Sequence, residues 1–434
     1  MSRNILAVTG NPVLHSLSPV LMNAAIKAND IDYRYLRLPA KSAEEAMQTF
    51  RMLDFKGMNV TAPFKKDIMQ FLDCLTDNAR KADAVNCVYM RDGKYWGDNT
   101  DITGVELSIK QFPEFLSYGK MLVIGSGGAS NAVIIAGQNM GLKVTVCARN
   151  VSALADLKNK YGVETATLDS VHRLVKSHKI IVQALPANAR VFDPKELSAD
   201  CMILDANYKN SIFEEPSKTI GYKFLSGKNW LVNQAIPAFE TFTGCRVSAG
   251  VMYQALDDYH FDYRGRIALT GFMGVGKTTS GRQLAKKMNY RFIDMDVEIE
   301  KQEGMKISEI FATRGEDYFR QVETEILERY ADEVDVILSC GGGTAKSAYN
   351  REILRGKFVN LWLYASAAYC IDGLDISNRP LLQCGDPAAA AEKMLQERIP
   401  MYVDGAYGII NVMNLNRYKT ADKIYEQIVE TFGI

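Results

Sequence analysis

The stretch that decides the fold of the second half of this chain is RIALTGFMGVGKT, at residues 266–278. It begins with an apolar run typical of a strand, ends in the phosphate-binding pattern GxxxxGK[ST], and leads into a helical pattern. The glycines allow backbone amides to wrap a phosphate group, and the helix N-terminus adds partial positive charge. The sequence therefore predicts a nucleoside triphosphate site, with Lys277 on the β- and γ-phosphates and the Thr278 hydroxyl on Mg²⁺. The full set of expected nucleotide contacts is Gly274, Gly276, Lys277, Thr278 and Thr279.

Polar motifs that suit phosphoryl transfer follow this loop. Asp294 and Asp296 end the next predicted strand two residues apart, so both side chains leave the same face. One of them can orient water on Mg²⁺ while the other holds a substrate hydroxyl, although the same pattern also serves as a helix cap. A glycine triplet at 341–343 allows a ligand to approach the backbone closely. Three separated arginines either bind a small carboxylate and a migrating phosphoryl group or form surface ion pairs: Arg320, Arg379 and Arg398.

Together these motifs resemble those of shikimate kinase, over essentially all of residues 265–434. The resemblance implies a P-loop domain with a central parallel sheet, which transfers the γ-phosphoryl group of ATP to the 3-hydroxyl of shikimate. Its catalytic residues would be Lys277, which stabilises the moving phosphate, and Asp296, which holds the attacking hydroxyl. The implied metal contacts are Thr278 and Asp294. The implied substrate contacts are Arg320, Gly342 and Arg398 at the carboxylate, and Arg379 on a mobile lid.

A second glycine-rich turn, Gly125-Ser-Gly127-Gly128-Ala129, follows an apolar run and opens another helical pattern. It departs from strict GxGxxG, but its glycines can supply the tight turn and the close approach to a dinucleotide pyrophosphate. The next predicted strand is followed by Arg149 rather than by an acidic residue. An acidic residue there binds the ribose 2′-hydroxyl of NAD, whereas an arginine fits the 2′-phosphate, so the sequence favours NADP. The expected cofactor contacts are Gly125, Gly127, Gly128, Ala129 and Arg149.

The residues before this turn carry hydroxyl, amine, amide and carboxylate groups beyond predicted strands. Ser16 and Ser18 lie two residues apart just before a helical pattern, where a serine followed by proline also reads as a plain helix start. Thr61 and Lys65 follow a predicted strand, and Asn86, Asn99 and Asp101 come next along the chain. A lysine and an aspartate of this kind either form a structural ion pair or handle a proton in catalysis.

This set resembles shikimate dehydrogenase, and the resemblance covers about residues 4–260. It implies a discontinuous substrate lobe (1–103 and 229–260) around a Rossmann-like NADP lobe (104–228), and the reduction of 3-dehydroshikimate by NADPH. Lys65 and Asp101 would hold the 3-keto oxygen and manage its proton. The implied substrate contacts are Ser16, Ser18 and, more weakly, Tyr208 at the carboxylate, and Thr61, Asn86, Asn99 and Gln234 at hydroxyls. The resemblance requires no metal in this half.

Composition narrows the classes of function. The 434 residues carry 51 basic and 51 acidic side chains, so no global field recruits a nucleic acid or an anionic membrane. The chain is 47% apolar and 24% charged, which is typical of a globular protein, and it has no apolar run that predicts a transmembrane helix. The eight cysteines form no CxxC pair, which favours free thiols over a zinc site or a disulfide framework. We expect a cytoplasmic protein with small-molecule substrates, either a monomer or a homodimer.

Strand-like and helical patterns alternate along the chain, which predicts an α/β fold with mostly parallel sheets. In the first part the expected strands are 5–8, 57–60, 121–124, 143–147, 180–184 and 202–205, and the expected helices are 18–29, 42–53, 64–75 and 129–140. In the second part the expected strands are 266–270, 292–294, 336–339 and 358–363, and the expected helix is 277–288. The polar and aromatic segment 257–265 marks the main domain boundary. The two halves are either packed together or only tethered through it.

Our leading hypothesis is a bifunctional enzyme, because the product of the first implied reaction is the acceptor of the second. A second hypothesis keeps the dehydrogenase fold but moves the substrate to quinate or the cofactor to NAD. A third makes one half a ligand-binding or regulatory module without catalysis. Its support is the altered cofactor turn and the absence, in residues 369–378, of the arginine that covers the adenine in shikimate kinases. The presence of all four expected catalytic residues favours the first hypothesis: Lys65, Asp101, Lys277 and Asp296.

Overall fold

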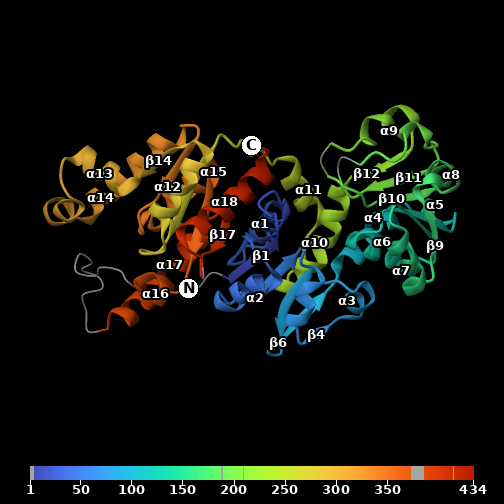
Figure 1. Ribbon diagram of the computed structural model, residues 1–434, viewed down its shortest axis with the longest axis horizontal. Helices are drawn as coiled ribbons and strands as arrows, with labels where there is room; N and C mark the ends of the chain where they lie inside the picture. The colour runs from blue at the N-terminus through green and yellow to red at the C-terminus, as the bar shows by residue number, and fades with distance from the viewer. Residues whose placement is uncertain (1–3, 187–188, 209, 373–385, 414) are drawn as a thin grey trace.

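The computed structural model describes residues 4–434 apart from 187–188, 209, 373–385 and 414, and it confirms the expected α/β class (Figure 1). The described strands form two sheets. The smaller sheet has six parallel strands in the order β12-β11-β10-β7-β8-β9. Their bounds are Lys120–Ile124 (β7), Lys143–Ala148 (β8), Glu164–Thr167 (β9), Ile180–Gln183 (β10), Met202–Asp205 (β11) and Lys223–Leu225 (β12).

The larger sheet has eleven strands in the order β14-β15-β13-β16-β17-β2-β1-β3-β5-β6-β4. All neighbours from β14 to β3 are parallel, whereas β5 and β6 form an antiparallel hairpin beyond β3. In the first half the bounds are Asn4–Gly10 (β1), Tyr33–Pro39 (β2), Gly57–Val60 (β3), Cys74–Leu75 (β4), Cys87–Arg91 (β5) and Lys94–Asp98 (β6). In the second half they are Arg266–Gly271 (β13), Arg291–Asp294 (β14), Val336–Ser339 (β15), Val359–Tyr364 (β16) and Gly408–Asn411 (β17).

Helices pack on both sheets (Figure 1). Those of the first half are Ser18–Ala28 (α1), Ala43–Met52 (α2), Asp77–Ala82 (α3), Thr100–Lys110 (α4), Pro113–Leu116 (α5), Gly128–Asn139 (α6), Val151–Tyr161 (α7), Val171–Ser177 (α8), Glu214–Ile220 (α9), Gly227–Thr243 (α10) and Ala249–Asp257 (α11). Those of the second half are Lys277–Met288 (α12), Met295–Glu303 (α13), Ile307–Ala331 (α14), Ala348–Lys357 (α15), Ala367–Ile371 (α16), Pro387–Gly405 (α17) and Arg417–Phe432 (α18). None of these described helices combines the length and the apolar character that a bilayer crossing requires.

The two halves are packed together, and their strands belong to one sheet. Strand β17 of the second half runs parallel to β2 of the first half, with Gly408 opposite Arg37. Ile409 and Ile428 of the second half lie in the same buried hydrophobic cluster as Leu38 and Phe50 of the first. Full burial of such a side chain contributes about 1.5–3 kcal/mol, so this shared core holds the halves in one arrangement.

Buried polar contacts cross the same junction. Lys423 on α18 is 2% exposed and forms an ion pair with Glu45 on α2. Burial lowers the pKa of Lys423, while the carboxylate of Glu45 opposes that shift. Asn411 Nδ2 donates to Thr49 Oγ1 at 2.8 Å. Because a buried charge or amide is tolerated only when it is paired, these contacts favour a single register between the halves.

The segment 257–265, expected as the domain boundary, is anchored at this junction through its aromatic residues. Phe261 lies 5.4 Å from Tyr407 between ring centroids, and Tyr263 stacks on Phe432 at 3.9 Å. Each such aromatic pair adds about 0.5–1.5 kcal/mol beyond the area it buries. The segment therefore packs against the second half rather than bridging a gap.

The helix expected at residues 64–75 is wrong. Asp67–Phe71 forms a 3-10 turn instead, and the last two residues form β4, which runs parallel to β6. The apolar residues do follow helical spacing, but Asp73 N donates to Tyr95 O at 2.9 Å and Asp73 Oδ2 accepts from Tyr95 N at 2.8 Å. Tertiary pairing with β6 thus overrides a local helical preference, which is a weak determinant on its own.

The parallel strands bring loops from both halves to one edge of the larger sheet. The loops after β1 and β3 leave this edge in the first half, and the phosphate loop after β13 leaves it in the second. At about 4.8 Å per strand, the steps from β13 to β1 separate these loops by roughly 20 Å. The fold therefore places two groups of candidate residues on one side of one sheet.

Candidate active sites

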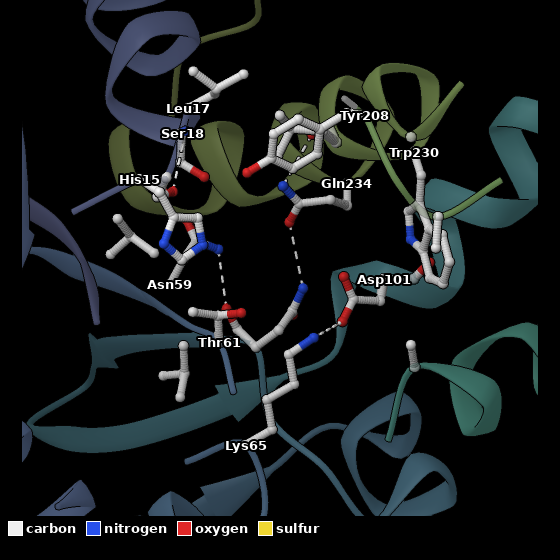
Figure 2. Close-up of a pocket in the computed structure, with 18 residues that line it drawn as sticks. His15, Leu17, Ser18, Asn59, Thr61, Lys65, Asp101, Tyr208, Trp230 and Gln234 are labelled. Atoms are coloured by element: carbon white, nitrogen blue, oxygen red, sulfur yellow. Dashed lines mark hydrogen bonds and ion pairs between the residues drawn. The ribbon is translucent and has the colours of Figure 1, made fainter. Parts of the chain in front are cut away.

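A cavity of about 280 Å³ lies in the first half, beside the lobe built on the six-stranded sheet (Figure 2). Segments far apart in the chain line it: the loop after β1, the loop after β3, the start of α4, and α10. Most of the residues expected at the substrate are among its lining: Ser16, Ser18, Thr61, Lys65, Asn86, Asp101, Tyr208 and Gln234. The sequence did not single out several further lining residues, including His15, Leu17, Asn59, Trp230 and Leu231.

An ion pair between Lys65 and Asp101 lies at one side of the cavity. Lys65 Nζ is 2.5 Å from Asp101 Oδ2, and Figure 2 shows the two side chains pointing toward one another. The Lys65 side chain is 25% exposed and that of Asp101 is 12% exposed, so the pair faces the cavity rather than the core. Trp230 Nε1 donates to Asp101 O at 3.1 Å and fixes the start of α4. The Lys65 ammonium can therefore donate a charge-assisted hydrogen bond to a ligand oxygen while the Asp101 carboxylate holds the ammonium in place.

Amide and hydroxyl groups form a connected network beside this pair. Asn86 Oδ1 accepts from Thr100 N at 2.7 Å, and Asn86 Nδ2 lies 3.4 Å from Gln234 Oε1. Gln234 Nε2 also donates to Leu231 O at 2.9 Å, which holds its side chain against α10. Because each amide has a second partner, the network presents donors and acceptors in a fixed geometry that suits a polyhydroxylated ligand.

Hydroxyl groups occupy another part of the cavity. Ser16 Oγ accepts from Ser18 N at 3.3 Å, so the two serines are held together at the start of α1. Burial raises the pKa of Tyr208 further above its ordinary value of 10.0, so its hydroxyl is a neutral donor. Neutral hydroxyl donors beside a helix N-terminus suit a carboxylate, because the helix dipole favours negative charge there.

Asn99 is the expected substrate contact that does not line this cavity. It precedes α4, is 2% exposed, and its Nδ2 donates to Ala84 O at 2.9 Å. Its Oδ1 is buried with no hydrogen-bond partner among the described residues. The structure therefore places Asn99 behind the cavity, where it supports the turn that presents Asp101.

The glycine-rich turn after β7 fits a dinucleotide. Gly125 has φ +124°, and a Cβ there would lie 2.6 Å from Ala184 O, so only glycine suits this position. A Cβ at Gly127 or Gly128 would meet nothing within 4 Å, which leaves open space at the N-terminus of α6 for a pyrophosphate. Ala129 in the first turn of α6 lines the substrate cavity. The residues present therefore fit NADP(H), and the turn that would hold it reaches the cavity lined by Lys65 and Asp101.

Arg149 occupies the place where a 2′-phosphate is expected. It follows β8, is exposed, and makes no hydrogen bond or ion pair in the described part of the chain. The next residue, Asn150, caps α7 by accepting from Ala153 N at 3.1 Å, which fixes the backbone beside it. An exposed guanidinium on a fixed backbone is well suited to a phosphate group.

The phosphate loop after β13 has the backbone that the glycines were expected to allow. Gly274 and Gly276 have φ +75° and +95°, and a Cβ at Gly274 would lie 1.9 Å from Cys370 O. Lys277 Nζ donates to Gly271 O and Phe272 O, both at 2.9 Å, so it lies curled into the loop. Burial lowers the pKa of Lys277. The loop, the start of α12 and this amine fit the phosphates of ATP.

Thr278 and Asp294, expected at a metal, are adjacent. Thr278 Oγ1 donates to Asp294 Oδ2 at 2.8 Å, and Asp294 Oδ1 accepts from Asp296 N at 3.2 Å. Asp294 is thus a helix cap for α13, the structural alternative that the sequence left open. Over the residues described, no group of three or more His, Cys, Asp or Glu side chains could hold a metal ion. Mg²⁺ is commonly bound through one or two protein ligands, substrate phosphates and water, and the Thr278–Asp294 pair fits that mode.

The remaining kinase-type residues gather around the glycine triplet 341–343. Arg398 is 8% exposed and donates from Nη1 to Gly342 O at 3.2 Å. A Cβ at Gly343 would lie 2.6 Å from Arg320 Nη2, and one at Gly341 would lie 3.1 Å from Asp296 Oδ1. The structure therefore brings Asp296 and two of the arginines together, whereas Arg379 lies outside the described residues.

Sequence reasoning missed Glu323, which organises this second site. Its side chain is 1% exposed, accepts from Arg320 Nη1 at 2.8 Å and from Thr344 Oγ1 at 2.6 Å. It therefore ties the arginine to the turn that follows the glycine triplet. The available signal was its position three residues after Arg320 on one helix, since such residues are neighbours on the helix surface.

Comparisons with known families match both halves. Residues 273–431 match the family model described as shikimate kinase. Residues 8–88 match the model described as the shikimate dehydrogenase substrate binding domain. The two resemblances expected from the motifs are thereby confirmed.

Individual relatives match the first half. The shikimate dehydrogenase (NADP(+)) of Aquifex aeolicus is 33% identical over 258 residues, which cover 58% of this chain and 95% of that protein. A crystal structure of shikimate dehydrogenase from Aquifex aeolicus has a TM-score of 0.56 at 32% identity, covering 59% of this chain and 98% of that one. Shikimate 5-dehydrogenase from Thermus thermophilus, solved with NADP(H) and shikimate, has a TM-score of 0.54 at 26% identity, with 58% and 98% covered.

Proposed function

The chain belongs to the shikimate dehydrogenase family and carries a shikimate kinase domain in its second half, and we propose that it catalyses two successive reactions. In the first, 3-dehydroshikimate, NADPH and a proton give shikimate and NADP⁺. In the second, the γ-phosphoryl group of ATP moves to the 3-hydroxyl of shikimate, giving shikimate 3-phosphate and ADP. We assign residues 1–103 and 229–260 to the substrate lobe, 104–228 to the NADP lobe and 265–434 to the kinase domain.

The observation that carries the first activity is the convergence of the ion pair, the serines and the cofactor turn on one cavity. Lys65 and Asp101 come from different elements, and Ala129 brings the dinucleotide turn to the same cavity. A hydride donor bound at α6 would therefore lie next to a charged proton donor. If Lys65 and Asp101 formed only a structural ion pair, there would be no reason for the pair to line an open cavity next to a dinucleotide-binding turn.

The first reaction needs a group that neutralises the 3-keto oxygen as it becomes an alcohol. The turn 125–129 and Arg149 would hold NADPH, which would supply a hydride to the carbonyl carbon. The ammonium of Lys65 hydrogen-bonds to the oxygen and donates the proton, and Asp101 holds that amine in place. Ser16, Ser18 and Tyr208 bind the carboxylate, while Asn86, Gln234 and Thr61 hold hydroxyls. These contacts fix the ring with its carbonyl at the ion pair.

The second reaction needs an oriented hydroxyl and compensation of phosphate charge. Asp296 accepts a hydrogen bond from the 3-hydroxyl and aligns it toward the γ-phosphate. The Lys277 amine exchanges its hydrogen bonds to Gly271 O and Phe272 O for hydrogen bonds to the transferred phosphoryl group, whose negative charge it stabilises. The shikimate carboxylate is bound by Arg398, Arg320 and the Gly342 amide. Arg320 already donates hydrogen bonds to Glu316 and Glu323, so the substrate must share this guanidinium with them. Thr278 and Asp294 would hold Mg²⁺, which would offset the negative charge of the ATP phosphates.

The pure chain, incubated with 3-dehydroshikimate, NADPH and Mg-ATP, tests this function directly. We expect NADPH consumption, transient shikimate and then shikimate 3-phosphate. Without ATP the reaction should stop at shikimate, and with shikimate and ATP alone the phosphate should form without NADPH. ATP binding without phosphoryl transfer, or no consumption of NADPH, would contradict the bifunctional assignment.

Cofactor choice is tested at Arg149. The substitution Arg149→Ala should raise KM for NADPH by about 10- to 100-fold, because a hydrogen bond to a charged phosphate is lost. It should leave KM for NADH nearly unchanged, since NADH has no 2′-phosphate. The matched control is Arg173→Ala, which removes an exposed arginine of the same lobe. Equal effects on both cofactors would refute the 2′-phosphate contact.

A further inference from the structure

The loop between β1 and α1, residues 11–17, is held by side chains of the other half of the chain. Gln427 Oε1 accepts from Val13 N at 3.0 Å, and Gln427 Nε2 donates to Asn11 Oδ1 at 2.7 Å. Tyr407 donates from its hydroxyl to Leu14 O at 3.0 Å. Val13 and Leu14 are fully buried, so these backbone groups have no access to water. Kinase-domain side chains therefore satisfy polar groups of a loop in the dehydrogenase half.

The same loop is tied to the kinase domain a second time, through Arg37. This arginine is 5% exposed, and its Nε and Nη2 donate to Ser16 O at 3.1 and 2.9 Å. Its Nη1 donates to Tyr407 O at 3.3 Å, and its guanidinium lies 3.9 Å from the centroid of the Tyr407 ring. A buried guanidinium needs partners for its donors, and here Tyr407 supplies both a carbonyl and a ring face.

The loop held by these contacts carries Ser16 and leads to Ser18, the two serines assigned to the substrate carboxylate. Ser16 accepts from Ser18 N through its hydroxyl, and both serines line the cavity. The loop leaves β1 as irregular backbone, so no strand or helix ladder sets its shape between Asn11 and Leu17. A binding group must be held within about 0.5 Å of its productive position by the residues behind it. Tyr407 and Gln427 occupy that position behind the serines.

We propose that the kinase domain is a structural part of the dehydrogenase active site, with Tyr407 and Gln427 acting as positioning residues for the loop that binds the substrate carboxylate. This inference rests on the proposed function, since it takes Ser16 and Ser18 as carboxylate contacts. The kinase domain then contributes to the first reaction without touching its substrate or cofactor. The kinase domain thereby affects the binding of 3-dehydroshikimate and leaves the rate of the chemical step unchanged.

Full-length variants test the proposal through the split between KM and kcat. Tyr407→Phe removes the bond to Leu14 but keeps the ring under Arg37, and Gln427→Met removes the bonds to Val13 and Asn11. Each should raise KM for 3-dehydroshikimate about fivefold, the factor that corresponds to one net hydrogen bond. The kcat of reduction, KM for NADPH and both kinase constants should stay within about twofold. The matched control is Tyr349→Phe, whose hydroxyl donates to Glu328 inside the kinase domain at 2.7 Å.

Three results separate the possible failures. If Ser16→Ala raises KM for 3-dehydroshikimate but neither positioning variant does, the proposed function stands and this inference is wrong. If the positioning variants lower dehydrogenase and kinase kcat together, the contacts serve general stability, which also overturns it. If the unmodified chain does not reduce 3-dehydroshikimate at all, the proposed function itself fails.

Discussion

Replacing Lys65 with alanine is expected to abolish reduction of 3-dehydroshikimate while phosphorylation of shikimate continues at the unmodified rate. Lys65 Nζ lies 2.5 Å from Asp101 Oδ2 at the cavity, and the proposed mechanism takes the proton for the new alcohol from this amine. Loss of a positioned general acid costs about 100- to 10,000-fold in kcat. NADPH absorbance measures the first reaction, and ADP release with shikimate as acceptor measures the second.

The chain offers a close control at the next residue. Lys66 is also a lysine in the turn after β3, but its side chain is 74% exposed and pairs with Asp83 at 2.8 Å. Lys66→Ala should leave both activities within about twofold, because surface ion pairs contribute little. Asp101→Asn provides a second variant with nearly unchanged shape, and it should also lower kcat strongly. If Lys65→Ala kept more than a tenth of the unmodified kcat, another group would have to supply the proton.

Much of the first site could be predicted because its residues follow strands of one sheet. Lys65 follows β3 and Ser16 follows β1, and both strands are parallel neighbours that end at the same edge. Asp101 and Gln234 were harder to place from spacing alone, because α4 and α10 approach only through tertiary packing. The resemblance to a family supplied them. Asn99 was expected at the substrate from its motif; in the structure it is not among the residues that line the cavity, and its Nδ2 donates to Ala84 O.

The union of the two halves could not be predicted, because it depends on β2 and β17. Neither strand was expected from the sequence, and their pairing joins the strands of the two halves into the single eleven-stranded sheet. Strand β17 has only the residues Gly408–Asn411, and its apolar core is two isoleucines, too short a run to distinguish a strand from a loop. The buried Lys423 on α18 also reads as an exposed helical residue until Glu45 is placed opposite it. Long-range pairing of this kind leaves little local signal.

The shared sheet brings the two sites to one edge without merging their chemistry. Lys65 lines the cavity of the first half, whereas Lys277 lies in the phosphate loop after β13. The side-chain hydrogen bonds from Tyr407 and Gln427 to the first half end on the loop 11–17, whereas the described hydrogen bonds of the Lys277 amine stay within the phosphate loop. A change in the phosphate loop should therefore leave the first reaction intact, and this asymmetry can be measured.

Replacing Lys277 with alanine is expected to abolish phosphorylation while reduction of 3-dehydroshikimate continues at the unmodified rate. The amine is the charged group of the phosphate loop and now donates to Gly271 O and Phe272 O, each at 2.9 Å. Removing a donor that stabilises transition-state charge costs about 100- to 1000-fold in kcat. The same two assays apply, and Lys286→Ala is the matched control, since Lys286 lies exposed on the same helix, α12.

The pH profile gives an independent test of the same amine. Burial lowers the pKa of Lys277 below the ordinary lysine value of 10.5, so the free enzyme loses this charge earlier than an exposed lysine as pH rises. Bound phosphates favour the charged form. The profile of kcat/KM for ATP, which reports the free enzyme, should therefore fall at a pH below 10.5. The profile of kcat, which reports the enzyme with ATP bound, should fall at a higher pH than the profile of kcat/KM. Identical alkaline limbs in the two profiles, or a Lys277→Ala enzyme that still phosphorylates shikimate within tenfold of the unmodified rate, would remove Lys277 from the catalytic role.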